Sequence, residues 1–531
     1  MHQLSYPPGD PAFDVAGWRL SAQIISFDNI YGLDPEGTSL TTAAGRTAIA
    51  SGRLTWAGGR EREEGTARID AAEVDGALEV VVSAACARAI RCVKLSVSGL
   101  PKGEVIGAFW GRMPLPPNGL VLTYPMPLHT PLVFLAPPDG SYLYFRSRDD
   151  RVRAKRFAFF EASDGVTAEL IFEEAAHEMS GAVTTPPWRI GRCADPDAVV
   201  AQHAASVATA YGLEPWESRP DVPSWAREIA LVATIHGMHW SGYVFNDYDA
   251  MLRALRWIAG RIEGRRLLAF LPGWEGRYYW QYGDYRPEPR LGGEQGFRRL
   301  VDGARELDVK LMPMFGMNCA NANLPGFERW GAPAVLRSPG RLVFHGNRPD
   351  WDASRAHDPG WQAWLNPGSP SWRDHLVEQV SRLVDRYDLP AVFFDTQHVW
   401  INDAQHPMYE GIVAVRDALK ARFPDLLIAG EGWYDALGAV TPVSQVGAPQ
   451  RWPEIFSKHC RTFLHLSAGD PSRGSTGVHE QGQAPFRPAP DAPYWWPTLP
   501  IVDGTLERAP ERAEEVIAQA RRYVETYLSG S

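Results

Sequence analysis

The sequence has few cysteines and no long apolar run, and each shortage excludes a class of protein. Its five cysteines are odd in number and scattered, and none forms a Cys-x-x-Cys pair, which argues against a structural zinc site. No segment approaches the roughly 20 consecutive apolar residues of a membrane-spanning helix. The first ten residues have no basic segment followed by an apolar one. We therefore expect no secretory signal, and a cytoplasmic protein with reduced thiols.

Positive charge is also scarce. The chain has 53 Lys and Arg against 63 Asp and Glu, and the net charge of −10 argues against nucleic acid or an anionic membrane as the main partner. The sequence has no HxH or HExxH motif around His236, His239, His398 or His479. We therefore expect these histidines to form hydrogen bonds, and we expect no metal or other cofactor. The sequence leaves open whether the chain forms a homo-oligomer.

Aromatic residues are abundant. The chain of 531 residues contains 20 Trp, 18 Tyr and 21 Phe. Aromatic side chains stack on the apolar faces of sugars, but they also fill hydrophobic cores, so composition alone does not separate the two uses. The length exceeds that of one ordinary core and predicts two large domains.

The first third of the chain has the pattern of a β-sandwich. Between about residues 15 and 192, apolar or alternating runs are separated by Gly, Pro and Asp, and helical periodicity is almost absent. We therefore predict a large antiparallel β-sandwich. A helix is predicted at Pro196–Tyr211, and the Pro-rich segment that follows marks the boundary between a sandwich domain (1–212) and a second domain (213–531). The predicted strands include Trp18–Phe27, Ala77–Ala85, Cys92–Ser98, Leu120–Tyr124, Leu143–Arg146, Phe157–Phe160 and Ala168–Phe172.

The second domain alternates strands with helices, which is typical of parallel α/β architecture. Eight predicted strands match the number in a (β/α)8 TIM barrel, with a doubly wound open sheet as the alternative. The strands are Ile229–Ile235, Leu267–Leu271, Val309–Phe315, Ala391–Asp395, Leu426–Glu431, Pro442–Val446, Thr462–Leu466 and Thr498–Asp503. The helices are Asp249–Ile262, Gly293–Leu307, Ser371–Tyr387, Met408–Phe423 and Ala509–Leu528.

Two acidic residues close short apolar strands in this domain. Asp395 ends the fourth predicted strand and Glu431 ends the fifth. Because the C-terminal ends of barrel strands open onto one face, both carboxylates are predicted to point into one mouth. Two carboxylates in one cleft are the minimum needed to cleave a glycosidic bond. An Asp at a strand end also commonly caps a turn, whereas Glu is poor in that role.

The segments after the predicted strands carry many aromatic, amide and charged residues. Long loops of this composition are usually functional. At one rim of a barrel they would form a cleft with sugar-stacking platforms and groups that hydrogen-bond hydroxyls. The substrate-binding candidates are His236, Trp240, Trp274, Tyr279, Asp284, Asn318, Gln397, His398, Trp433, His479, Glu480, Trp495 and Asp503.

Several of these stretches resemble glycoside hydrolases that combine an N-terminal β-sandwich with a catalytic barrel. The order of motifs is similar to barrels of the α-galactosidase and endo-α-N-acetylgalactosaminidase type, and to a related group of uncharacterised barrel domains. The resemblance covers about residues 225–505. It rests on Tyr282–Pro287 with Leu291–Gly293, Val309–Pro313, Ser369–Asp374, Phe393–Asp395 and Gly430–Gly432.

The resemblance implies roles for the two acids. In the endo-α-N-acetylgalactosaminidase and α-amylase types the nucleophile ends the fourth strand and the acid/base ends the fifth. Asp395 and Glu431 occupy these two positions. In the α-galactosidase type the acid/base ends the sixth strand, where this sequence has no acid near Val446. Barrels of the β-galactosidase type have Asn-Glu at the end of the fourth strand and Glu at the end of the seventh. This sequence has neither feature. An α-linked substrate is implied.

The sequence thus favours a retaining glycosidase that acts on a small oligosaccharide or glycoside taken up by the cell. Asp395 would attack the anomeric carbon, and Glu431 would protonate the leaving oxygen and then activate water. An inverting glycosidase with the same two acids and a non-catalytic carbohydrate-binding barrel are the alternatives. A lyase or isomerase would need a metal or a lysine base at a strand end, and the sequence offers neither.

Overall fold

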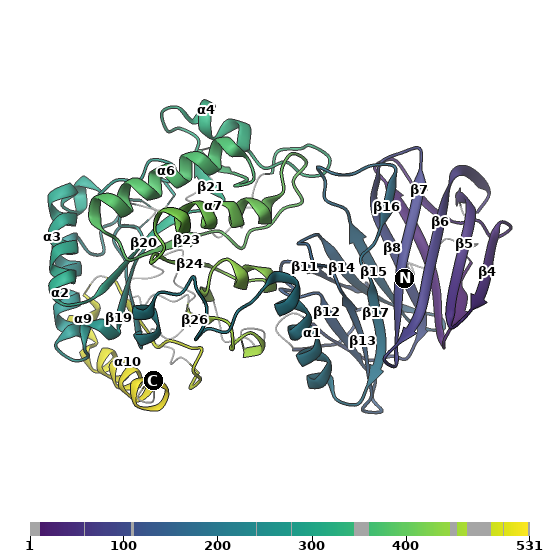
Figure 1. Cartoon of the computed structure of the whole chain (residues 1–531), viewed down its shortest axis with the longest axis horizontal. Helices are drawn as coiled ribbons and strands as arrows, with labels where there is room; N and C mark the ends of the chain where they lie inside the picture. Colours follow the sequence, from purple (N-terminus) through teal and green to yellow (C-terminus); the bar gives the residue numbers. More distant parts are fainter. Residues whose placement is uncertain are drawn as a thin grey trace.

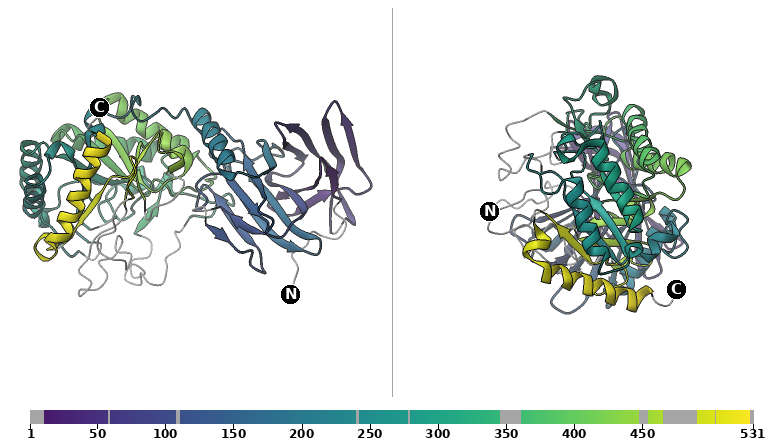
Figure 2. Two further views of the ribbon diagram at one scale, coloured as in Figure 1. Left: turned by 90° about the horizontal axis from the view of Figure 1, so that it is seen from below. Right: turned by 90° about the vertical axis from the view of Figure 1, so that its left-hand side faces the viewer.

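The computed structural model describes residues 11–57, 59–107, 111–239, 242–277, 279–344, 361–446, 454–464, 490–502 and 504–528. These residues form a large antiparallel β-structure followed by a barrel of parallel strands (Figure 1). The two units lie side by side along the long axis of the molecule, as Figure 1 and the left view of Figure 2 show. The predicted β-sandwich followed by a (β/α)8 barrel is therefore confirmed.

The described part of the N-terminal region contains 17 hydrogen-bonded strands. Apolar side chains that face the interior are aligned across neighbouring strands. Between β2 and β8, Leu20 pairs with Val97 and Ala22 with Leu95, and all four side chains are fully buried. The strands are β1 (Phe13–Val15), β2 (Trp18–Ser26), β3 (Ile30–Leu33), β4 (Thr38–Ala43), β5 (Arg46–Trp56), β6 (Glu61–Val74), β7 (Ala77–Cys86), β8 (Ile90–Leu100), β9 (Glu104–Ile106), β10 (Arg112–Met113), β11 (Leu120–Tyr124), β12 (Leu132–Ala136), β13 (Tyr142–Ser147), β14 (Lys155–Ala162), β15 (Gly165–Glu173), β16 (Ala182–Thr184) and β17 (Trp188–Cys193).

The barrel is built from eight parallel strands that pair in the order of the chain. An isolated parallel bridge between Thr462 and Trp495 joins the last two strands, and the Leu464 amide donates to Thr498 Oγ1 at 3.1 Å. The strands are β18 (Leu231–Ile235), β19 (Leu267–Leu271), β20 (Lys310–Gly316), β23 (Ala391–Asp395), β24 (Leu427–Glu431), β25 (Val443–Val446), β26 (Arg461–Leu464) and β27 (Thr498–Ile501).

Helices cover the outside of the barrel (Figure 1). The principal ones are α2 (Tyr248–Ala259), α3 (Gly293–Glu306), α6 (Pro370–Tyr387), α7 (Met408–Arg422) and α10 (Pro510–Tyr523). Shorter elements are η2 (Ser224–Glu228), η3 (Gly264–Arg266), η4 (Pro289–Leu291), β21 (Cys319–Asn321), α4 (Phe327–Trp330), η5 (Ala332–Ala334), β22 (Gln362–Trp364), η7 (Asp435–Ala439), α9 (Thr505–Arg508) and η9 (Val524–Leu528). Among the described residues no helix has the length and apolar character needed to cross a membrane.

Aromatic rings fill the interior of the barrel below its mouth. The Phe270 ring lies 4.3 Å from that of Phe393 and 5.8 Å from that of Phe463, so strands β19, β23 and β26 meet at the barrel axis. Side chains two residues apart in a strand point to the same side. Asp395 follows Phe393 by two positions and therefore points into the interior from the top of β23.

Helix α1 (Pro196–Tyr211) joins the two units (Figure 2). Val199 and Val200, in its first turns, pack against the sandwich strands. Val207, near its end, packs with Leu213 against Trp433 and other residues of the barrel. The helix is thus a shared part of both cores, and it supports a fixed junction.

Candidate active site

Asp395 and Glu431 end neighbouring strands at the same level of the barrel. Phe394 of β23 pairs with Gly430 of β24, so the next residues, the two acids, are also level. Adjacent strands lie about 4.8 Å apart, and level residues of parallel strands point to the same side. Asp395 is 4% exposed. The Glu431 side chain is 16% exposed. One carboxylate is thus held in the interior, while its neighbour is partly open to solvent.

The residue after Asp395 connects the two acids. The Thr396 amide donates to Glu431 Oε2 at 2.9 Å, and the Thr396 hydroxyl donates to the Asp395 carbonyl at 2.6 Å. Thr396 has φ 63°, which is rare for a β-branched residue. Such a conformation costs about 1–3 kcal/mol, and similar strain is concentrated at functional sites. The strained turn aims the Thr396 amide at the second carboxylate.

Tyr282 supports Asp395 from the loop after β19. The Tyr282 hydroxyl donates to Asp395 Oδ2 at 2.7 Å, and its ring is fully buried. Gly316, level with Asp395 on β20, leaves the space for this ring, because a Cβ at Gly316 would lie 2.2 Å from it. The hydrogen bond restricts rotation of the Asp395 carboxylate. A hydrogen bond to a charged group contributes about 1.5–3 kcal/mol.

Two glycines next to Glu431 make room for side chains of the loop after β23. A Cβ at Gly430 would lie 2.0 Å from the Gln397 side chain, and one at Gly432 would lie 2.3 Å from the His398 ring. His398 Nδ1 lies 3.1 Å from the Glu431 carbonyl oxygen and 3.6 Å from Glu431 Oε2. Burial lowers the pKa of His398, although Asp395 and the hydrogen bond to Glu431 oppose the shift. His398 therefore favours the neutral imidazole.

Asn318 and Gln397 hold the loop after Asp395 in place. Asn318 Nδ2 donates to the carbonyls of Thr396 at 2.9 Å and Val399 at 2.8 Å. Gln397 is fully buried, and its Nε2 donates to Thr441 Oγ1 at 3.0 Å. Both side chains, predicted to bind substrate, make contacts that shape the loop carrying His398.

A third carboxyl group lies near Asp395. Glu275, in the loop after β19, is fully buried, and neither carboxyl oxygen has a hydrogen-bond partner among the described residues. Burial raises its pKa well above the ordinary value, and the nearby charges of Asp395 and Glu288 add to the shift. Glu275 is thus favoured in the protonated form, as a neutral acid near Asp395.

Three predicted sugar-stacking tryptophans lie in hydrophobic cores. Trp274 is fully buried; its Nε1 donates to the Met314 carbonyl at 2.9 Å, and its ring packs against Phe297 of α3. Trp433 and Trp495 are each 1% exposed and pack together in the cluster beneath α1. These rings are covered by other side chains, so they offer no face to a sugar in this conformation.

The other predicted residues have different positions. His236 and Tyr279 are buried near the strand ends, and the Tyr279 ring lies 5.3 Å from that of Tyr282. The Asp284 side chain is 39% exposed and lies 3.9 Å from Arg286, so it belongs to the surface. The predictions at Trp240, His479, Glu480 and Asp503 fall outside the described residues.

Sequence reasoning did not assign Tyr282 or Thr396 to the site. Each depends on a feature that has no sequence signature: the space above a glycine for Tyr282, and a left-handed turn for Thr396. Among the described residues no group of three His, Cys, Asp or Glu side chains could hold a metal ion. On β25, the position level with Glu431 is Gln445, an amide.

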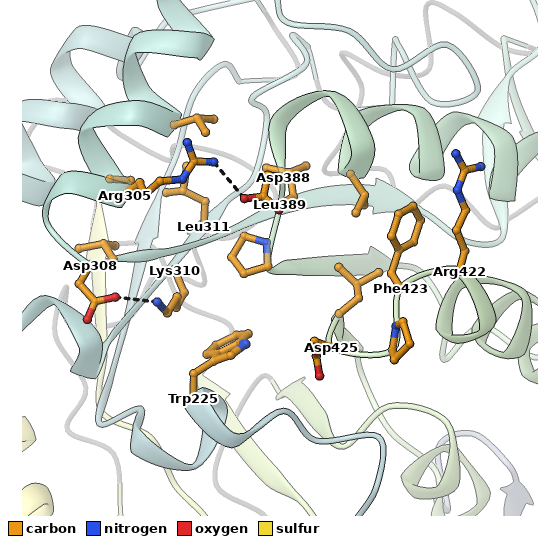
Figure 3. Close-up of a pocket in the computed structure, with 17 residues that line it drawn as sticks. Trp225, Arg305, Asp308, Lys310, Leu311, Asp388, Leu389, Arg422, Phe423 and Asp425 are labelled. Atoms are coloured by element: carbon orange, nitrogen blue, oxygen red, sulfur yellow. Dashed lines mark hydrogen bonds and ion pairs between the residues drawn. The ribbon is translucent and has the colours of Figure 1, made fainter.

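A pocket of about 480 Å³ lies at the opposite end of the barrel (Figure 3). It is lined by residues at strand starts, including Lys310 of β20, and by the loops that precede β23 and β24. Four of its charged groups form pairs within the pocket, Arg305 with Asp388 and Lys310 with Asp308. Barrel active sites lie at the C-terminal strand ends, so this pocket is not the candidate site.

No protein-family model and no curated protein matches the sequence. Solved structures do match its fold. A ligand-free α-N-acetylgalactosaminidase from Bifidobacterium bifidum aligns with a TM-score of 0.65 and 13% identity, covering 96% of this chain and 90% of that one. A GH36 α-galactosidase from Geobacillus stearothermophilus in complex with raffinose aligns with a TM-score of 0.55 and 12% identity, covering 97% and 76%. The predicted resemblance is confirmed as one of fold.

The close packing around Gly430 gives a test of the site that needs no substrate. We expect Gly430→Ala to destabilise the protein by about 1–3 kcal/mol, because the added methyl group must displace the buried Gln397 amide. The melting temperature should fall by about 2–8 °C. Gly52→Ala is the matched control, since no atom lies within 4 Å of its added Cβ. Equal melting temperatures for the two variants, measured by circular dichroism, would contradict the described packing.

Proposed function

We propose that the protein is a retaining glycosidase in which Asp395 is the nucleophile and Glu431 the acid/base. The observation that carries the proposal is the level placement of the two carboxylates on β23 and β24, with Thr396 hydrogen-bonded to Glu431 and Tyr282 to Asp395. The likeness of the fold to solved glycosidases supports glycosidase activity, while the roles of the two acids rest on the arrangement of the site.

The strand geometry favours retention over inversion. Retaining enzymes hold their two carboxyl groups about 5–5.5 Å apart, while inverting enzymes separate them by about 6.5–9.5 Å to admit a water molecule. The strand spacing of about 4.8 Å and the hydrogen bond across the two strand ends favour the shorter separation. Burial of Asp395 suits a nucleophile that meets the sugar, and the more exposed Glu431 suits a group that exchanges protons with water.

The proposed reaction has two steps. In the first, an Asp395 carboxylate oxygen bonds to the anomeric carbon while the bond to the leaving oxygen breaks, and protonated Glu431 gives its proton to that oxygen. In the second, the Glu431 carboxylate removes a proton from water, whose oxygen attacks the anomeric carbon and displaces Asp395. The sugar is released with its original anomeric configuration.

We propose an α-linked substrate of the galactose series. The solved neighbours named above are an α-galactosidase, in complex with raffinose, and an α-N-acetylgalactosaminidase. In this chain the acid/base would come from the fifth strand, since Gln445 occupies the level position on the sixth. A panel of nitrophenyl α-galactoside, α-N-acetylgalactosaminide, α-glucoside and β-galactoside would identify the sugar, and NMR of the first-formed product would separate retention from inversion.

The central prediction concerns the two acids. We expect Asp395→Asn and Glu431→Gln each to lower kcat on the nitrophenyl glycoside that the unmodified protein hydrolyses, by about a thousandfold or more for Asp395→Asn. Asp425→Asn, in the pocket at the opposite end of the barrel, is the matched control and should retain full activity. Near-normal turnover by a folded Asp395→Asn protein would remove Asp395 from the mechanism.

The hydrogen bond to Asp395 gives a second prediction. Tyr282→Phe removes the hydroxyl that orients the carboxylate, so kcat/KM should fall about 10- to 100-fold. Tyr285→Phe is the control, because this neighbouring buried hydroxyl accepts instead from the Gly316 amide at 2.7 Å. Steady-state kinetics of both variants test the assignment. Equal losses in the two would indicate a general packing effect rather than support of the nucleophile.

A further inference from the structure

The loops that follow the two acids both reach the N-terminal sandwich. Glu431 is followed four residues later by Asp435, and the loop after Asp395 contains Asn402. Both side chains are buried, and both form hydrogen bonds with residues of the sandwich. The sandwich therefore contacts the loops on both sides of the candidate pair.

Asp435 is held by the end of β11 and by the segment that leads from it to β12. Tyr124 Oη donates to Asp435 Oδ1 at 2.7 Å, and Thr130 Oγ1 donates to Asp435 Oδ2 at 2.8 Å. The Asp435 amide in turn donates to the carbonyl of His129 at 2.9 Å. Three contacts from one short segment thus fix the position of a residue that begins η7, directly after the Glu431 loop.

The orientation of the Thr130 hydroxyl follows from its two neighbours. Thr130 Oγ1 gives its only proton to Asp435, so it must accept from His203 Nε2, which lies 2.7 Å away on α1. Burial lowers the pKa of His203 to about 3, which keeps this imidazole neutral. Burial raises the pKa of Asp435 to about 6, while Tyr124 and Thr130 oppose the shift by bonding the charged form. The sandwich hydroxyls therefore stabilise a carboxylate that burial alone would disfavour.

His129 brings the same sandwich segment close to the acid/base. The residue is 4% exposed, and its backbone has φ 65°, a left-handed conformation that is uncommon outside glycine. Burial, with the nearby His398, lowers the pKa of His129 to about 3. His398 itself lies against Gly432 and contacts Glu431. His398 thus has both Glu431 and the sandwich residue His129 in its neighbourhood.

Asn402 makes the corresponding link on the side of Asp395. Asn402 Nδ2 donates to Glu173 Oε1 at 3.0 Å and to the Glu174 carbonyl at 2.8 Å, and Asn402 Oδ1 accepts from the Ala176 amide at 2.8 Å. All three partners belong to the end of β15 and the segment after it. The amide group of Asn402 therefore uses its donors and its acceptor on one sandwich edge.

We propose that the sandwich positions the two acids, with Thr130 acting on the Glu431 side and Asn402 on the Asp395 side. The inference rests on the function proposed above and adds positioning residues from outside the barrel. Displacing a reacting group by about 1 Å can lower the rate about a hundredfold. Contacts that hold the loops next to the two acids can therefore affect the rate. The alternative is that these contacts only join the two domains.

Two substitutions separate these cases. Thr130→Val keeps the shape of the side chain and removes the hydroxyl that bonds Asp435, and Asn402→Ala removes the link to β15. Thr55→Val is the matched control, because this buried sandwich hydroxyl donates to the Leu33 carbonyl at 3.1 Å, away from the junction. Thr130→Val and Thr55→Val should both lower the melting temperature. Of these two threonine variants, only Thr130→Val should change the kinetics.

The leaving group provides a readout that a purely structural role would not affect. Proton donation by Glu431 is needed for a poor leaving group such as an alkoxide, and hardly needed for fluoride or dinitrophenolate. Thr130→Val should therefore lower kcat/KM about tenfold or more on an alkyl glycoside and less than about threefold on the glycosyl fluoride. Asn402→Ala should lower kcat/KM on both substrates, since nucleophilic attack is needed for each.

The outcomes also separate this inference from the proposed function. If Asp395→Asn and Glu431→Gln are inactive but Thr130→Val and Asn402→Ala have the kinetics of Thr55→Val, the sandwich does not position the acids and the inference fails alone. Equal losses on both substrates for Thr130→Val would also contradict it. If Asp395→Asn and Glu431→Gln retain activity, the proposed function itself fails. A loss of kcat/KM in Thr130→Val that depends on the leaving group, together with unchanged kinetics in Thr55→Val, supports the proposal that the sandwich positions the acids.

Discussion

The hydrogen bond from the Thr396 amide to Glu431 Oε2 joins the ends of two neighbouring barrel strands, and the geometry of the site depends on it. It requires β23 and β24 to be in register, so that the two acids are level. It also requires Thr396 to adopt a left-handed backbone, with φ 63°, which Asn318 stabilises by bonding the turn. Two glycines, Gly430 and Gly432, make room for the loop that forms this turn.

The sandwich extends this support outward. Asp435 and Asn402 connect the loops after both acids to one neighbouring domain, and α1 contributes to the cores of both units. Hydrogen bonds that anchor a buried carboxylate are costly to break, because the group left behind loses its partners in a place that water does not reach. A barrel built this way gains rigidity at its mouth from residues that lie far away in the sequence.

The sequence predicted the parts of this arrangement that follow from local pattern. The bounds of β19, β23 and α1 agree with the predicted ranges, and Asp395 and Glu431 do end strands four and five. The role of an aromatic side chain could not be predicted, because Trp274 and Trp433 differ from a sugar platform only in what covers them. Tyr282 reaches Asp395 through the space above Gly316, and Thr130 reaches Asp435 across a domain junction. Both contacts depend on tertiary structure alone.

The most direct measurement of the central claim is to trap the covalent intermediate. The protein would be incubated with a fluorinated glycosyl fluoride matched to its preferred sugar, which slows the second step more than the first, and then digested and analysed by mass spectrometry. The account predicts one added sugar, attached to the peptide that contains Asp395 and absent from the Asp395→Asn protein. A label on a different carboxylate would contradict it, as would turnover that gives an inverted product without any labelled intermediate.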